Sequence, residues 1–155
     1  MKKLSLTLCA ALLLAVTTLQ AADNYLGTWT LNVAKSKYDP GPAAKSQTTK
    51  LEAVAGGAMK EIGDRVNADS SKTHWEWTAK FDGKDYPVMG DPDRDTVALK
   101  RVDDNTVEVT NKKAGKVTNS MKIVVAKDGK SRTNEAAFTN AKGVKVHNIL
   151  FFDKQ

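Results

Sequence analysis

Two arginines of this chain fall in phase with apolar residues on predicted strands. Arg101 is in phase with Val97 and Leu99. Arg132 shares a strand face with Phe138. A guanidinium presents a fork of N–H donors that fits a carboxylate, whereas an unpaired polar group in a solid core costs roughly 1–3 kcal/mol. The pattern therefore indicates either a wet cavity in which these arginines meet an anionic ligand, or positions near solvent at the ends of the strands.

The segment 72–82 shows the clearest alternation between two strand faces. Its apolar face comprises Trp75, Trp77, Ala79 and Phe81. Its polar face comprises His74, Glu76, Thr78 and Lys80. This alternation favours a buried aromatic face over an exposed surface on which nucleic-acid bases could stack.

Such a face could line a cavity for a small hydrophobic or amphipathic molecule. Burial of apolar ligand area would drive affinity by about 25 cal/mol per Å² before the costs of binding. A few polar contacts would orient the ligand, and asparagines that alternate with apolar residues could supply them: Asn111, Asn119, Asn134 and Asn148. The candidate ligand-binding residues are Trp75, Trp77, Phe81, Arg101, Met121, Arg132, Leu150 and Phe152.

Other chemistries lack the residue patterns that they need. His74 and His147 are the only histidines, and both fall on outward faces, so we expect surface positions rather than metal ligands. Residues 91–95 begin like a calcium loop, but the required later Gly and Glu are absent, which indicates a turn in which Arg94 balances the local charge. No nucleophile elbow or phosphate-binding loop is present. We predict no catalytic residue, no metal and no cofactor.

The first 21 residues have the three-part pattern of a secretory signal peptide. Cleavage there would remove Lys2 and Lys3, lower the formal net charge from +6 to +4, and leave one domain over residues 22–155. It would also remove Cys9, the only cysteine, which lies too early to be a lipoprotein cysteine. We therefore expect a periplasmic or secreted monomer with no integral membrane association. The scattered lysines disfavour a nucleic-acid partner.

Turn residues recur at short intervals and divide the chain into segments of strand length that are rich in Val, Thr, Trp, Phe and Ile. The predicted strands span about 26–33, 46–55, 58–66, 72–82, 84–89, 95–102, 106–112, 117–127, 131–139 and 144–153. Closely spaced hairpins predict an all-β fold: a single up-and-down antiparallel barrel of about eight to ten strands. The Pro- and Gly-containing segment 35–45 is either a lid over one barrel end or a plain ordered loop.

The Leu-Gly-Thr-Trp sequence at 26–29 and the strand plan resemble the calycin group, which comprises lipocalins and fatty-acid-binding proteins. The resemblance implies that Trp29 plugs the closed end of a barrel and that the interior binds a small molecule. Fatty-acid-binding proteins also carry an Arg-x-Tyr pair in the last strand that holds a ligand carboxylate. The corresponding positions here are Leu150 and Phe152, and the helical pair that caps those proteins has no counterpart in 35–45.

Three hypotheses follow from these patterns. The first is an exported lipocalin-like protein that binds a small molecule in its barrel. The second is a filled barrel that acts through its loops as an interaction or inhibitor protein. The third is a cofactor-free isomerase or cyclase, which needs an ionisable group inside the cavity: Arg101, Arg132, His74 or Glu76.

Overall fold

The computed structural model describes residues 23–140 and 142–155. The predicted signal peptide, its cleavage point and Cys9 lie outside these residues. The described residues form eleven strands and two short 3₁₀ turns: β1 (Gly27–Leu31), η1 (Val33–Lys35), β2 (Lys37–Asp39), β3 (Ser46–Val54), η2 (Ala55–Gly57), β4 (Ala58–Val66), β5 (Lys72–Ala79), β6 (Tyr86–Met89), β7 (Thr96–Arg101), β8 (Thr106–Lys113), β9 (Lys116–Val125), β10 (Ser131–Thr139) and β11 (Lys145–Lys154).

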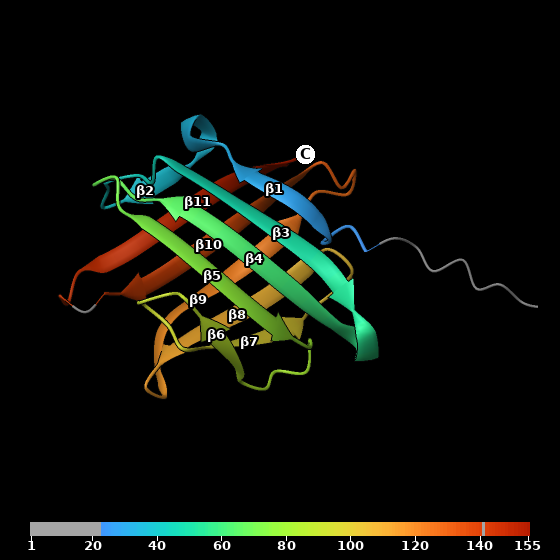
Figure 1. Cartoon of the computed structure of the whole chain (residues 1–155). Helices are drawn as coiled ribbons and strands as arrows, with labels where there is room; N and C mark the ends of the chain where they lie inside the picture. Colours follow the sequence, from blue (N-terminus) through green and yellow to red (C-terminus); the bar gives the residue numbers. More distant parts are fainter. Residues whose placement is uncertain (1–22, 141) are drawn as a thin grey trace, which may run out of the picture.

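The strands form one closed antiparallel barrel (Figure 1). From β3 to β11, each strand pairs with the next in the sequence. β1 pairs with β3 on one side and with β11 on the other, which closes a ten-stranded ring. Closure removes the unpaired edges of an open sheet. The predicted all-β, up-and-down barrel is therefore confirmed.

The eleventh strand corrects the prediction for residues 35–45. β2 lies within that segment and pairs with β11 over His147–Ile149. Its three residues carry too little local pattern to identify a strand, and the pairing comes from a partner that is distant in the sequence. The predicted strand 26–33 is also too long, because the Asn32 side chain accepts a hydrogen bond from the Lys35 amide and starts η1.

Two predicted boundaries around residues 80–85 also need correction. β5 ends at Ala79 and β6 begins at Tyr86, whereas the sequence predicted strands over 72–82 and 84–89. The Asp82 carboxylate accepts a hydrogen bond from the Lys84 amide at 3.1 Å, which forms a turn. Pairing in this segment is reduced to an isolated bridge between Asp82 and Lys100.

The predicted strand faces are confirmed where they can be compared with burial. Trp75, Trp77 and Ala79 are buried, whereas His74 and Thr78 are exposed. The same alternation buries the inner residues of the following strands: Val97, Leu99, Val107, Val109, Ile123 and Val125. The polar and apolar faces identified from the sequence are therefore the outer and inner faces of the barrel.

One end of the barrel is closed by the residues around the start of β1. Trp29 is fully buried, and its indole N–H donates to the Tyr25 carbonyl at 3.0 Å. The Tyr25 ring makes an edge-on contact with Phe81 at a centroid distance of 6.1 Å. Lys154 lies over the Trp29 ring at 5.1 Å. Trp29 therefore occupies the closed end, as the resemblance to calycins implied.

Candidate functional site

The barrel encloses a cavity of about 780 Å³ that extends towards the opposite end. Its wall includes residues from the β6–β7 and β10–β11 connections, among them Arg94 and Lys142. Five of the predicted ligand-binding residues line it: Trp75, Trp77, Met121, Arg132 and Leu150. Three do not: Phe81, Arg101 and Phe152. A cavity of this size falls within the range that holds small molecules.

Arg132 lies on β10 and is only 2 % exposed. Its Nη2 donates a hydrogen bond to Thr49 Oγ1 at 2.7 Å. Its Nε and Nη1 are buried and have no hydrogen-bond partner among the described residues. The guanidinium carbon lies 5.8, 5.0 and 4.8 Å from the ring centroids of Tyr25, Trp29 and Phe152. Burial lowers the pKa of this guanidinium below its ordinary value, because the charge has lost its water.

Arg132 differs from the other arginines in its lack of an acidic partner. Within residues 23–140 and 142–155, Arg65, Arg94 and Arg101 each form an ion pair, and Arg132 forms none. An unpaired buried charge costs several kcal/mol in effective terms. The inner end of the cavity therefore carries a positive charge that no direct ion pair among the described residues neutralises, and Glu61 stabilises it only through longer-range Coulomb attraction.

Arg101 lies at the closed end instead. Its Nη2 donates to Asp23 Oδ2 at 2.6 Å, and its guanidinium carbon lies 4.1 Å from the Phe81 ring centroid. These contacts fix the chain segment before β1 to the end of β7. The two arginines looked equivalent in the sequence, but the structure places only Arg132 in the cavity wall.

The pairing of β10 with β11 places Arg132 beside two residues of the last strand, Leu150 and Phe152. Arg132 lies directly opposite Phe152, and Asn134 lies opposite Leu150. Leu150 and Phe152 are the residues that the sequence resemblance matched to the Arg-x-Tyr pair of fatty-acid-binding proteins. Here the polar side chains stand on the neighbouring strand, β10, at the same height of the barrel.

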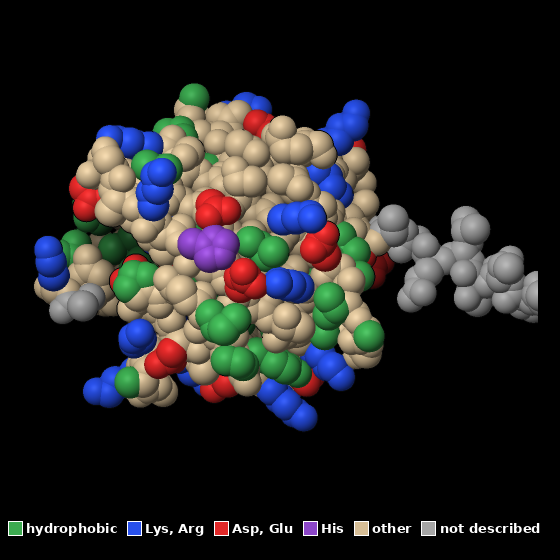
Figure 2. All heavy atoms as spheres, viewed as in Figure 1, with side chains coloured by type: hydrophobic (Ala, Val, Ile, Leu, Met, Phe, Trp, Pro, Cys, Tyr) green, Lys and Arg blue, Asp and Glu red, His purple; other side chains and the backbone are tan. Residues whose placement is uncertain are grey.

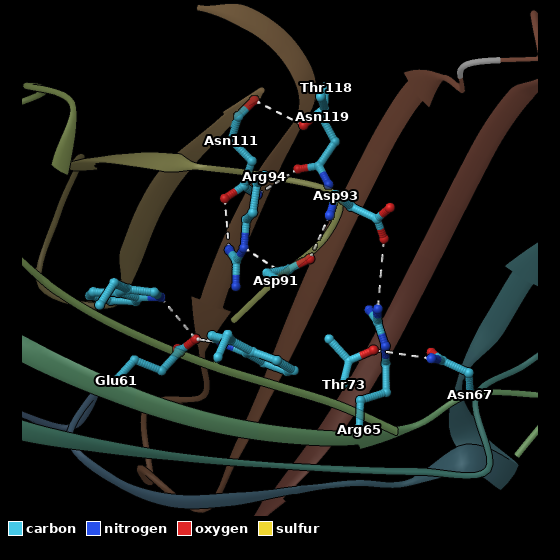
Figure 3. A network of polar contacts seen from close by, with 12 residues as sticks. Glu61, Arg65, Asn67, Thr73, Asp91, Asp93, Arg94, Asn111, Thr118 and Asn119 are labelled. Atoms are coloured by element: carbon cyan, nitrogen blue, oxygen red, sulfur yellow. Dashed lines mark hydrogen bonds and ion pairs between the residues drawn. The ribbon is translucent and has the colours of Figure 1, made fainter. Parts of the chain in front are cut away.

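Glu61 on β4 is a cavity residue that the sequence analysis missed. It is 8 % exposed, and its Oε1 accepts indole hydrogen bonds from Trp75 at 2.7 Å and from Trp77 at 3.2 Å (Figure 3). Its phase with buried Met59 and Gly63 is the signal that could have identified it. Gly63 leaves space for the Trp75 ring, because a Cβ there would lie 2.1 Å from ring atoms.

A polar network of Asp91, Arg94, Asn111 and Asn119 lies in the cavity wall (Figure 3). Arg94 donates to Asp91 Oδ2 at 3.0 Å and to Asn111 Oδ1 at 2.7 Å. Asn111 in turn donates to Asn119 Oδ1 at 2.7 Å. The Arg94 guanidinium carbon also lies 5.5 Å from the Trp75 ring centroid. The network confirms that Arg94 balances an aspartate of the 91–95 turn, and it holds that turn over the cavity.

The outer surface of the barrel carries both histidines. His74 Nδ1 lies 2.8 Å from Asp64 Oδ1, and His147 Nε2 lies 2.9 Å from Glu135 Oε1. Acidic, basic and apolar side chains are interspersed on the face seen in Figure 2.

Across residues 23–140 and 142–155, His, Cys, Asp and Glu side chains form no group of three suited to a metal ion. Over the same residues, no helix has the length and apolar character that a membrane span requires.

Comparisons with known proteins add a distant structural likeness. No protein-family model matches the chain. No curated protein matches it either. Three solved chains match, among them the tryptamine complex of the amine binding protein of Rhodnius prolixus, with 14% sequence identity and a TM-score of 0.44. The match covers 84% of this chain and 64% of that one. This likeness assigns neither a family nor a ligand, and the barrel fold described above rests on the strand pairing of the chain itself.

Proposed function

We propose that this protein is an exported, monomeric binding protein that holds a small amphipathic molecule with an anionic group inside its barrel. The observation that carries the proposal is Arg132. It lines the cavity, is almost fully buried, and has two guanidinium nitrogens without partners among the described residues. An anionic ligand would supply the missing counter-charge.

A bound anion would add charge-assisted hydrogen bonds that the empty protein lacks. A hydrogen bond to a charged group contributes about 1.5–3 kcal/mol, and a carboxylate can accept two from one guanidinium. The guanidinium packs among three aromatic rings, and no oxygen among the described residues accepts a hydrogen bond from its Nε or Nη1. We therefore expect the anionic group at the inner end of the cavity, close to β10.

The remaining wall of the cavity suits an apolar body. Trp77, Met121 and Leu150 line it, and Trp75 is held in place by Glu61. An apolar ligand portion that is buried against these side chains would gain about 25 cal/mol per Å² before the costs of binding. The ligand is therefore amphipathic, with its polar end innermost.

Paired ligands that differ only in charge test the proposal. Dodecanoate and dodecanol are titrated by calorimetry into protein that has been freed of bound lipid by unfolding and refolding. We expect Arg132→Met to weaken dodecanoate binding by about 10–100-fold, which corresponds to the loss of one or two charge-assisted hydrogen bonds, and to change dodecanol binding by less than about threefold.

The matched control is Arg101→Met, which removes a guanidinium outside the cavity wall and should leave both affinities unchanged. Equal loss of dodecanoate binding in the two variants, or none in either, contradicts the role of Arg132. Failure of the original protein to take up either compound contradicts a hollow binding barrel and favours the interaction or inhibitor hypothesis.

A further inference from the structure

The cavity contains a second buried charged side chain, and it points to a more specific ligand class. Glu61 lines the same cavity as Arg132. Both of its indole hydrogen bonds go to Oε1. None of the hydrogen bonds among residues 23–140 and 142–155 uses Oε2. The two indoles therefore fix the carboxylate and leave one oxygen without a donor.

Glu61 and Arg132 do not neutralise each other directly. They lie on different strands, β4 and β10. No ion pair among the described residues joins them, and Glu61 favours the charged form of Arg132 only through longer-range Coulomb attraction. Arg132 retains two unpartnered donors, whereas Glu61 retains an unpartnered acceptor. A buried charge without an ionic partner is costly. Among the described residues that line the cavity, Glu61 and Arg132 are the two charged side chains that are themselves buried, one of each sign.

An anion alone would satisfy only one of these two groups. It would complement Arg132, but it would also bring a second negative charge into the cavity that contains Glu61. Inside a protein the effective dielectric constant is lower than in water, so the repulsion between like charges is stronger there. A ligand that carries a donor group as well as an anionic group would complement both side chains.

We propose that the ligand is dipolar: an apolar amino carboxylate whose carboxylate meets Arg132 and whose ammonium group meets Glu61 Oε2. This inference rests on the proposed function, because it keeps the anionic group at Arg132 and adds a specificity residue, Glu61. The apolar part of the ligand lies along Met121 and Leu150. The site then distinguishes amino carboxylates from fatty acids through one buried carboxylate.

A matched series of three ligands tests this inference by calorimetry. Phenylbutyrate supplies the anion alone, phenylpropylamine supplies the ammonium alone, and homophenylalanine supplies both on the same apolar body. We expect the original protein to bind homophenylalanine at least about tenfold more tightly than either of the other two, which is the change expected for one additional charge-assisted contact.

The variant Glu61→Gln isolates the second contact, because glutamine keeps a side-chain oxygen that can accept the indole hydrogen bonds of Trp75 and Trp77. This variant should lose about tenfold in affinity for homophenylalanine and should bind phenylbutyrate as tightly as before or more tightly. Glu76→Gln, on the outer face of β5, is the matched control and should change neither affinity. Near-ultraviolet circular dichroism of the tryptophans confirms that the cavity is intact.

The outcomes separate this inference from the proposed function. Equal binding of phenylbutyrate and homophenylalanine, with both dependent on Arg132, overturns the dipolar ligand and leaves the anion-binding site in place. Phenylpropylamine binding that matches homophenylalanine and does not depend on Arg132 overturns both. Absence of binding for all three ligands also overturns both.

Discussion

Replacement of Arg132 by methionine should stabilise the ligand-free protein, because this side chain costs free energy that a ligand is expected to recover. The change removes one hydrogen bond to Thr49, a loss of about 2 kcal/mol. It also replaces three cation–π contacts by thioether contacts to the same rings, a net loss of about 1 kcal/mol, so the contacts together lose about 3 kcal/mol. It also relieves the desolvation of an unpaired guanidinium, about 5 kcal/mol. Methionine is flexible and packs well against aromatic rings. The expected net effect is a gain of about 2 kcal/mol in the free energy of unfolding, or about 5–10 °C in Tm.

Urea denaturation and thermal unfolding of lipid-free protein measure this effect. Arg101→Met is the matched control and should have the opposite sign, because Arg101 is paired with Asp23: we expect a loss of about 1 kcal/mol. A loss of stability of about 2 kcal/mol or more in Arg132→Met would refute the reasoning. It would mean that the guanidinium is fully compensated in the empty protein and has no need of a ligand.

Two further predictions concern the wall and the outer surface of the barrel. Gly63→Ala should lower the free energy of unfolding by about 2 kcal/mol, because the new Cβ would lie 2.1 Å from the indole of Trp75. The same change should alter the near-ultraviolet circular dichroism of Trp75, and an unchanged spectrum would contradict this packing. A hydrogen bond to Asp64 and, to a smaller extent, one to Glu76 raise the pKa of His74. Asp64→Asn should therefore lower the pKa of His74 in an NMR titration, and an unaltered titration would contradict the contact. Since the folded-state pKa is raised, the stabilisation from protonated His74 is fully present below its unfolded-state pKa and is lost as the pH rises through the folded-state value.

The strands and their inner faces were predictable because alternation is a local property of the sequence. Trp75 and Trp77 show this most clearly, since every second residue around them is polar. The different environments of Arg101 and Arg132 were not predictable. Both are in phase with apolar residues, but the partner of Arg101 is Asp23, which lies 78 residues earlier in the chain. Periodicity identifies the face of a strand, and it does not identify the barrel end or the long-range partner.

Glu61 illustrates the same limit in another form. Its phase within β4 was visible, but a glutamate between Lys60 and Ile62 gives no local indication that it accepts hydrogen bonds from two tryptophans on the next strand. The strand register that brings Glu61 opposite Trp77 is a property of the whole hairpin. The site therefore depends on pairing between strands, whereas the fold class depends on patterns within them.

The most direct test of the account observes the Arg132 side chain itself. The chain has four arginines, Arg65, Arg94, Arg101 and Arg132, so their Nε–H signals can be assigned in nitrogen–proton NMR spectra through single substitutions. We expect dodecanoate to shift the Arg132 Nε–H signal strongly downfield, as a new charge-assisted hydrogen bond requires, whereas dodecanol should not shift it. An Arg132 signal that dodecanoate leaves unmoved, although calorimetry shows that dodecanoate binds, would contradict the central claim that this buried guanidinium is the anion-binding group.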